Sequence, residues 1–339
     1  GSCPEQMMGS KSRMQGKDVS EQETMGKSNV GIDVCQSWLD VHILPSGVAF
    51  RIPNSSQGHR QLKRRLKDYD VALIVVEATG KWHRPIHRSL YASGYRVAVV
   101  NPLRARLFAE AVGLLAKTDR LDARMLAVFA MSLTPDARAP APKTVDEIKE
   151  LVQARLSAVD EQTALANQRT SVETAFLRRQ LDRRLRGIAK DIGQLEVEIL
   201  KRIKADDGLA RRYDILLSIP GFGPIVTSTL LVCLAELGNC DHNQIAILAG
   251  LAPLADQSGD RDGRRIIRAG RQPVRNVLYL AAVTAARFNR DMKTLYERLI
   301  ALGKPKKLAL IAVARKLVIL ANTLISENRP WMLHAPKHA

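Results

Sequence analysis

The sequence predicts an α/β domain followed by a mostly helical region. Residues 29 to 52 contain short apolar segments separated by turn residues, which is the pattern of neighbouring strands. Between residues 71 and 131 short apolar runs alternate with helical patterns. Beyond residue 143 the apolar residues recur at helical spacing, and 339 residues with 46% apolar content can build two or three domains.

The first strands form a possible meander. The apolar alternation predicts strands over 29–34, 39–44 and 48–52, with a turn at Pro45-Ser46-Gly47 between the second and the third. Ser55 or Ser56 then caps a basic helix that continues to about residue 69. The run over 71–76 is continuously apolar, which indicates a buried strand.

Helices and strands alternate in the next segment. We expect a helix from about residue 85 to Gly94, a strand over 96–100, and a helix that Asn101-Pro102 opens and Gly113 ends. A further helix spans 119–131, and its buried face is formed by Leu121, Met125, Leu126 and Phe129. Three early strands followed by this alternation suit a ribonuclease-H-like fold over residues 29–133.

The remaining chain divides into a linker, a coiled segment and a helical domain. Prolines 135, 140 and 142 interrupt residues 134–143, and the next part of the region up to residue 207 is helical by pattern. A heptad seam predicts an antiparallel hairpin or an intermolecular coiled coil: Leu181, Leu185, Ile188, Ile192, Leu195 and Ile199. Residues 208–330 form a helical domain. Residues 1–28 read as a disordered tail with Gly1-Ser2 as a cloning remnant, and 331–339 as a second tail.

Charge indicates the kind of partner. The formal net charge of +18 favours a polyanion, with nucleic acid as the first choice. A membrane surface is the alternative, but no stretch of about 18 uninterrupted apolar residues and no secretory signal pattern is present. The four cysteines have no spacing typical of zinc sites, which predicts free thiols. We therefore expect a cytoplasmic protein.

Four carboxylates occupy positions where an α/β nuclease core places metal ligands. Asp33 and Glu77 each end an apolar run, while Asp119 and Asp122 stand three residues apart at the start of a helix. Acidic groups that repel one another gather where a cation lies between them, and hard oxygen donors select Mg²⁺ or Mn²⁺. The alternative for Asp119 and Asp122 is capping of the helix amino terminus.

Two further segments suggest contact with phosphate. Gly221 and Gly223 in Ile219-Pro220-Gly221-Phe222-Gly223 match a helix-hairpin-helix turn, whose backbone N–H groups can bind a phosphate oxygen; an ordinary interhelical turn is the alternative. Ser258 follows in a polar loop, where it is either a turn residue or a nucleophile. Six arginines come after it and can stabilise developing charge: Arg261, Arg264, Arg265, Arg268, Arg271 and Arg275.

Several of these segments together carry a resemblance to a known family. They occur in this order: Gly31-Ile32-Asp33-Val34, Glu77-Ala78-Thr79-Gly80, Asn101-Pro102, Lys117-Thr118-Asp119-Arg120-Leu121-Asp122-Ala123-Arg124, Ile219-Pro220-Gly221-Phe222-Gly223, Gly250-Leu251-Ala252-Pro253 and Ser258-Gly259. The order resembles the DEDD transposases of the insertion sequence one-ten family over about residues 29 to 330. The segments 268–271 and 274–279 are more similar to its eleven-eleven subgroup, and the family is related to Piv-type DNA invertases.

The resemblance implies a RuvC-like first domain in a bacterial, nucleoid-associated protein, and specific roles for the residues above. Asp33, Glu77, Asp119 and Asp122 would hold Mg²⁺ (or Mn²⁺), and Ser258 would attack a DNA phosphodiester to form a phosphoserine link. Lys117, the two turn glycines and the arginines would contact nucleic acid. The implied partners are donor and target DNA, a structured guide (bridge) RNA, and further copies of the chain in a dimer or tetramer with composite sites.

Two other functions fit the same residues. One is a RuvC-like junction-resolving nuclease that uses metal-activated water, which would still cut DNA after Ser258→Ala and would form no covalent adduct. The other is a non-catalytic nucleic-acid scaffold, whose binding would depend on salt but not on the four acids or on metal.

Overall fold

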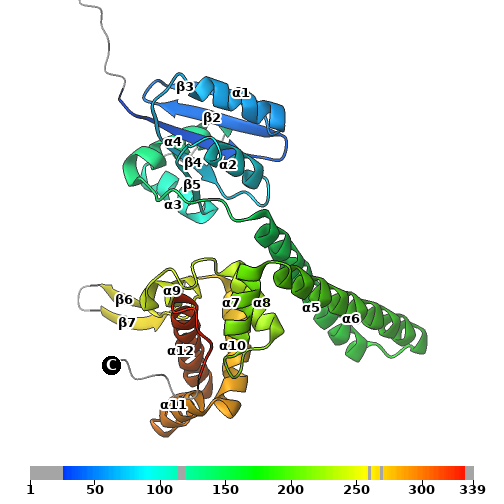
Figure 1. Cartoon of the computed structure of the whole chain (residues 1–339). Helices are drawn as coiled ribbons and strands as arrows, with labels where there is room; N and C mark the ends of the chain where they lie inside the picture. The colour runs from blue at the N-terminus through cyan, green and yellow to red at the C-terminus, as the bar shows by residue number, and fades with distance from the viewer. Residues whose placement is uncertain (1–25, 114–118, 259–260, 268–269, 333–339) are drawn as a thin grey trace, which may run out of the picture. The chain divides into compact units, whose positions relative to one another are not determined.

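The computed structural model describes residues 26–113, 119–258, 261–267 and 270–332 (Figure 1). The chain divides into two compact units, with the boundary between Pro140 and Ala141. The first unit contains a five-stranded sheet and the second is mostly helical. This arrangement confirms a mixed α/β part and a helical part.

The sheet of the first unit has the order β3-β2-β1-β4-β5. β1 pairs with β4 and β4 with β5 in parallel, whereas β2 is antiparallel to both of its neighbours, β1 and β3. The hairpin strands therefore lie at one side of the sheet and the strands joined by helices at the other. The strands are β1 (Ser28–Val34), β2 (Trp38–Leu44), β3 (Val48–Pro53), β4 (Val71–Glu77) and β5 (Val97–Val100).

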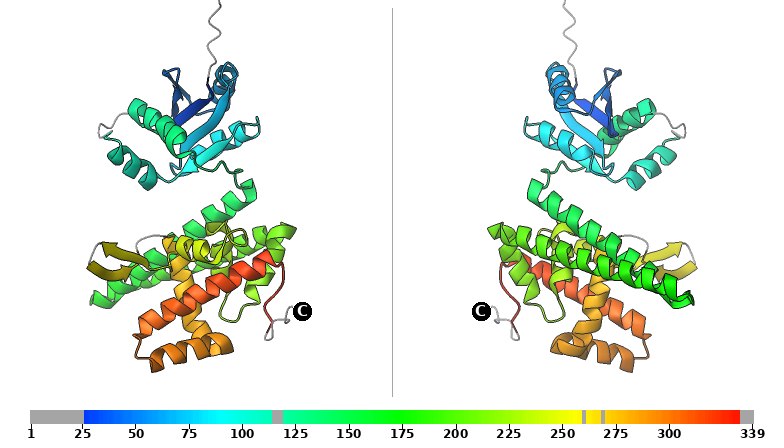
Figure 2. Two further views of the ribbon diagram at one scale, coloured as in Figure 1. Left: turned by 90° about the vertical axis from the view of Figure 1, so that its left-hand side faces the viewer. Right: turned by 90° about the vertical axis from the view of Figure 1, so that its right-hand side faces the viewer.

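Helices cover both faces of this sheet (Figure 2). On one face, α1 and α2 pack through Leu62 and Ile86 in a core that also contains Val30 and Ile32 of β1. On the other face, Phe129 of α4 packs with β4 and β5, and α3 supports it. The helices are α1 (Ser56–Leu66), α2 (His83–Tyr91), α3 (Pro102–Ala111) and α4 (Asp119–Leu133).

The contact between α4 and β1 depends on a glycine. An added Cβ atom at Gly31 would lie 2.1 Å from the carbonyl oxygen of Ala123 and 2.3 Å from the backbone nitrogen of Ala127. Both distances are far inside van der Waals contact, so only a residue without a side chain allows the helix to lie this close to the strand. Gly31 thereby determines how closely α4 approaches the sheet.

The predicted elements of the first unit agree closely with the structure. Ser55 is the N-cap of α1 and accepts a hydrogen bond from the Gly58 backbone N–H, but the helix ends at Leu66, three residues earlier than expected. Met125, Leu126 and Phe129 are buried as predicted, and the side chain of Leu121 lies outside the described part. The Asn101 side chain caps α3, with proline in the first turn.

In the second unit, two long helices form the predicted hairpin. α5 (Lys143–Ser171) and α6 (Ala175–Lys204) lie side by side and are joined by three residues (Figures 1 and 2). The seam residues of α6 are buried or half-buried, which confirms that they pack within the hairpin. Arg155 of α5 adds an ion pair with Glu196 of α6 at 2.7 Å.

The remaining helices build the largest core, which the hairpin joins through Ile148, Val152, Ile199 and Ile203. α12 is the one helix of the described residues that is long and apolar enough to cross a membrane. Its apolar sequence is interrupted by the charged residues Arg315 and Lys316. The helix packs against α10 in this core. The helices are α7 (Asp207–Leu217), α8 (Pro224–Cys233), α9 (His242–Leu248), α10 (Gln272–Phe288), α11 (Arg290–Ala301) and α12 (Lys306–Ser326).

One expectation for this unit was wrong. The segment around Ser258 was expected to be a polar loop, but it forms a two-stranded antiparallel sheet of β6 (Leu254–Ser258) and β7 (Arg261–Ile266). Strands are recognised in a sequence by apolar residues on alternate positions. These strands are almost entirely polar, so the pattern was absent although their backbones pair.

Gly31→Ala tests the approach of α4 to the sheet. We expect the free energy of unfolding of the first unit to fall by about 1–3 kcal/mol, because the new methyl group displaces the helix backbone. The control is Gly187→Ala in α6, where an added Cβ meets nothing within 4 Å. That change should stabilise the protein by roughly 0.5–1 kcal/mol, and chemical denaturation followed by tryptophan fluorescence measures both. Equal effects of the two substitutions would contradict the role of Gly31.

Candidate functional site

Two of the four predicted metal ligands end neighbouring parallel strands. β1 and β4 pair Ile32 with Val76, and Asp33 and Glu77 each follow one residue later. The two acids therefore stand next to each other at the carboxyl end of the sheet, where open α/β sheets bind their ligands. We call this place the acidic edge.

Strand alternation places both acids on the face that α4 covers. Val30 and Ile32 of β1 pack into the core on the opposite face, so Gly31 and Asp33 point the other way. On β4, Val75 packs with the α4 side chains, and Glu77 lies two residues further on the same face. Asp33 and Glu77 are both half-buried.

The third acid lies on α4, the helix that packs against β1. Ala123 is the residue of α4 whose carbonyl lies against Gly31, and the half-buried Asp122 directly precedes it. Asp119 starts the helix one turn earlier, and only its backbone position is described. Asp122 therefore belongs to the part of α4 that lies next to the strand of Asp33, and a shared site for the four acids stays a prediction.

The donors suit a hard divalent cation. Carboxylate oxygens are the ligands that Mg²⁺ and Mn²⁺ prefer, and the acidic edge offers no sulfur or imidazole donor from the predicted set. Among the residues whose side chains the structure describes, no group of three or more His, Cys, Asp or Glu has the geometry of a metal site. That set includes Asp33, Glu77 and Asp122, so the chemistry of the donors, and not their arrangement, is what supports a metal here.

A charged pair beside the acidic edge was missed by the sequence analysis. Asp40 of β2 stands opposite Asp33, and Arg51 of β3 stands opposite Asp40, so the three form a row across the sheet. The Arg51 Nε and Nη2 atoms donate to the two carboxylate oxygens of Asp40 at 2.8–3.2 Å. Asp40 is only 6% exposed. The hairpin register around Pro45-Ser46-Gly47 was the signal that could have revealed this row.

The pair has an electrostatic consequence for Asp33. Residues directly opposite on an antiparallel pair have Cβ atoms about 4.5–5.5 Å apart, and like charges there repel. The Arg51 guanidinium neutralises Asp40, so a second carboxylate can lie next to Asp33 without excess negative charge. His42, on the same face opposite Gly31, has its pKa lowered by burial and, to a smaller extent, by the positive charge of Arg124.

In the second unit, the two turn glycines connect α7 to α8. Gly221 has a φ of +106°, and an added Cβ there would lie 2.7 Å from the Cβ of Ala285 in α10. Gly223 is the N-cap of α8 and is followed by Pro224. Two consecutive helices are thus joined by a short turn. Gly221 is required there both for the backbone conformation and for packing against α10.

Ser258 is the last residue of β6 in a β-ribbon. Its backbone pairs with Arg261, the first residue of β7. At the base of the ribbon, Gly250 and Gly270 come together: an added Cβ at Gly270 would lie 2.1 Å from the Cα of Gly250. The Arg271 backbone N–H also donates to the carbonyl of Leu248 at 2.9 Å.

Arg271 fastens this base to the helical core. Its guanidinium makes two bonds to the Glu236 carboxylate, at 2.6 and 2.8 Å, and one to the carbonyl of Cys233 at 3.0 Å. The hydrogen bonds that the Arg271 guanidinium donates to Glu236 are the main reason that the pKa of Arg271 is raised. Arg271 therefore has a role inside the fold, and we do not include it among the proposed DNA contacts.

The structure describes some of the other residues that were predicted to contact nucleic acid. Arg275 is half-buried in the first turn of α10. For Arg261, Arg264 and Arg265 the structure gives backbone positions in β7. Lys117 and Arg268 lie outside the described residues.

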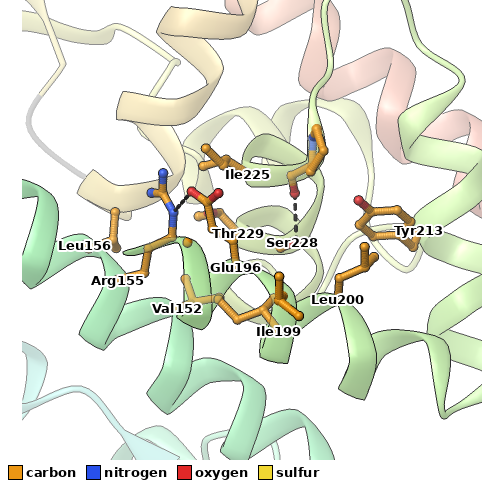
Figure 3. Close-up of a pocket in the computed structure, with 13 residues that line it drawn as sticks. Val152, Arg155, Leu156, Glu196, Ile199, Leu200, Tyr213, Ile225, Ser228 and Thr229 are labelled. Carbon is orange, nitrogen blue, oxygen red and sulfur yellow. Dashed lines mark hydrogen bonds and ion pairs between the residues drawn. The ribbon is translucent and has the colours of Figure 1, made fainter. Parts of the chain in front are cut away.

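A cavity elsewhere in the second unit differs in character from both candidate sites. It has a volume of about 430 Å³ and lies between α5, α6, α7 and α8 (Figure 3). Its walls are mainly aliphatic, with Val152, Ile199 and Leu200 around it, and its charged residues Arg155 and Glu196 neutralise each other. This chemistry suits packing of apolar groups and does not suit phosphoryl transfer.

Comparisons with known proteins add a family. A model of DEDD transposases of the IS110 type, described as Transposase, matches residues 30–175, and one described as Transposase IS116/IS110/IS902 family matches residues 213–297. The pilin gene-inverting proteins of Moraxella bovis and Moraxella lacunata are both 28% identical over 323 residues, which is 91% of this chain and 98% of theirs. An insertion element IS900 uncharacterized 42 kDa protein of Mycobacterium paratuberculosis is 32% identical over 138 residues, 38% of this chain and 34% of its own length.

Both models describe the same class of protein, and together they cover more than half of the chain, including the acidic edge and the ribbon. The chain is thus a transposase, an enzyme that recombines DNA. More particularly, it belongs to the IS110 family of transposases, and similarity to gene-inverting proteins extends along most of its length.

The Asp40–Arg51 pair generates a stability prediction. Arg51→Met leaves the Asp40 carboxylate buried without its main donor, and we expect a loss of about 1–3 kcal/mol in the free energy of unfolding. The double variant Arg51→Met with Asp40→Asn removes the charge as well, so much of this loss should be recovered. Urea denaturation of the two variants and the parent measures the difference. A double variant that is no more stable than the single one would refute the pairing.

Proposed function

We propose that this transposase exchanges DNA strands by using the acidic edge to bind metal and Ser258 as the nucleophile. The observation that supports the proposal is that Asp33 and Glu77 lie side by side at the carboxyl ends of β1 and β4, while α4, which carries Asp119 and Asp122, packs against β1 at Gly31. Such a set is suited to a polyanionic substrate only with divalent cations present, since phosphate and carboxylate repel each other.

Each part of the chain has a defined task in this reaction. A bound Mg²⁺ or Mn²⁺ would supply Lewis-acid stabilisation of the charge on the phosphate oxygens. The four acids hold and orient that cation, and the Arg51–Asp40 pair positions Asp33 through the neighbouring strand. The strand order of the first unit and its ligand-bearing edge support the RuvC-like assignment.

Ser258 forms a covalent bond to DNA in the first step of this reaction, and the second step breaks that bond again. Its Oγ atom forms a bond to the DNA phosphorus, while the bond from phosphorus to one deoxyribose oxygen breaks, and that oxygen takes the proton that the serine gives up. A deoxyribose hydroxyl of the other DNA strand then attacks the phosphoserine, which restores the serine hydroxyl. One phosphodiester replaces another, so no external energy source is needed. Arg261, Arg264, Arg265, Arg268 and Arg275 would neutralise the phosphates.

The remaining partners follow from the family resemblance. We propose that a structured bridge RNA selects donor and target DNA, that the Gly221–Gly223 turn and Lys117 contact nucleic acid, and that the protein acts as a dimer or tetramer with composite sites. The +18 net charge supports binding to more than one nucleic-acid segment.

A second candidate is hydrolysis of DNA junctions by metal-activated water at the acidic edge alone. The observation that favours it is that all four acids belong to the first unit, whereas Ser258 belongs to the second. The two reactions differ in their products, because hydrolysis leaves free ends and serine chemistry leaves protein attached to DNA.

Glu77→Gln tests the acidic edge. The amide keeps the shape of the side chain but removes the charge, so DNA strand exchange should fall at least a hundredfold, roughly the effect of losing one strong catalytic contact. The matched control is Glu110→Gln on α3, whose carboxylate pairs with exposed Arg106 at 3.0 Å. Recombination of a plasmid reporter measures both, and full activity of Glu77→Gln would reject the metal site.

Ser258→Ala tests the nucleophile. In cells that carry the complete element, we expect the parent protein to give a covalent protein–DNA adduct on a denaturing gel and Ser258→Ala to give none. The control is Ser171→Ala at the exposed end of α5, which should keep the adduct. Strand cleavage without an adduct in the parent would favour hydrolysis instead.

A further inference from the structure

A basic groove lies between α1 and α2, on the sheet face opposite α4. Two hollows of about 540 and 600 Å³ adjoin each other, because Arg60 and Lys63 line both, and we call them together the basic groove. α1 supplies the cationic wall, and α2 with the segment after it supplies hydroxyl groups. The groove is lined by Arg60, Lys63, Arg64 and Lys67 on one side and by Ser89, Ser93 and Tyr95 on the other.

The cations of this groove have no partners within the described part of the chain. Arg60, Lys63, Arg64 and Lys67 form no ion pair there, and three of them are exposed, with Lys63 half-buried. By contrast, the neighbouring Arg65 stacks on the Phe50 ring at 4.3 Å and does not line the groove. None of the lining residues is acidic. Four unpaired positive charges beside one another repel, and a bound anion removes that repulsion.

The spacing of the cations fits a chain of phosphates. Arg60 of α1 and Lys67, the C-cap of the same helix, are seven residues apart, a rise of about 10 Å. Successive phosphates of one DNA strand advance by about 3.4 Å along the duplex axis. The cationic wall therefore extends along several phosphates, which distinguishes it from a site for one small anion.

The chemistry of the acidic edge requires a surface of this kind. Its carboxylates repel the phosphodiester that they are proposed to process, so affinity for DNA has to come from cations elsewhere. The basic groove belongs to the same compact unit and lies on the other face of the sheet.

We infer that the basic groove between α1 and α2 binds the phosphate backbone of duplex DNA, away from the phosphate that is cut. This inference rests on the proposed function for its choice of DNA, but binding at the groove does not depend on metal or on Ser258. The contacts are to the backbone, so they hold DNA without reading its sequence.

The test uses the full chain in the Glu77→Gln background without divalent metal, so that only binding is measured. Arg60→Gln, Lys63→Gln and Lys67→Gln are combined, and fluorescence anisotropy reports affinity for a labelled DNA duplex over a range of salt concentrations. The control combines Lys304→Gln, Lys306→Gln and Lys307→Gln, three exposed residues of the second unit with the same total charge.

We expect the groove variant to bind DNA roughly tenfold or more weakly, and its slope of log affinity against log salt to become shallower by about 2 to 3. The control variant should retain most of the affinity. Equal losses in the two variants would overturn the inference, because net charge alone would then explain binding. A loss confined to an RNA hairpin of the same sequence would overturn the assignment to DNA. Full recombination by Glu77→Gln would overturn the proposed function alone, because binding at the groove is measured without metal and without cleavage.

Discussion

The close approach of α4 to β1 at Gly31 is the constraint on which the first unit depends. It packs the buried face of the helix onto the strands, and Asp122 directly precedes the residue whose carbonyl lies against Gly31. Asp33 lies two residues beyond Gly31 on the same face of β1. The core of the unit and its candidate chemistry thus share a single contact between two backbones.

Much of this unit could be predicted because its elements carry clear periodic signals. The strands are short apolar runs with turn residues between them, and the acids stand where those runs end. Asp40 and Arg51 were missed because their meaning depends on the register between strands, which places them beside Asp33. In the second unit the heptad seam predicted the helical hairpin, whereas β6 and β7 lacked apolar residues and were expected to be a loop.

The acidic edge and Ser258 are held in place by different structural features. The acidic edge rests on a packed sheet and helix, so each acid is placed by burial of the residues next to it. Ser258 belongs to a ribbon whose strands pair mainly with each other, while its base is tied to the core by Gly270 and Arg271. An ion pair stabilises the backbone arrangement near each of them: Asp40–Arg51 in the first unit and Glu236–Arg271 in the second.

The ribbon acts mechanically as a lever arm. Five residues of β6 separate its base from Ser258, a length of roughly 17 Å at about 3.4 Å per residue. A rotation of about 10° at the base therefore displaces Ser258 by roughly 3 Å, the length of one hydrogen bond. The rigidity of the Gly250–Gly270 contact and of the Arg271–Glu236 ion pair therefore determines how precisely Ser258 is positioned, although both lie at the opposite end of the ribbon.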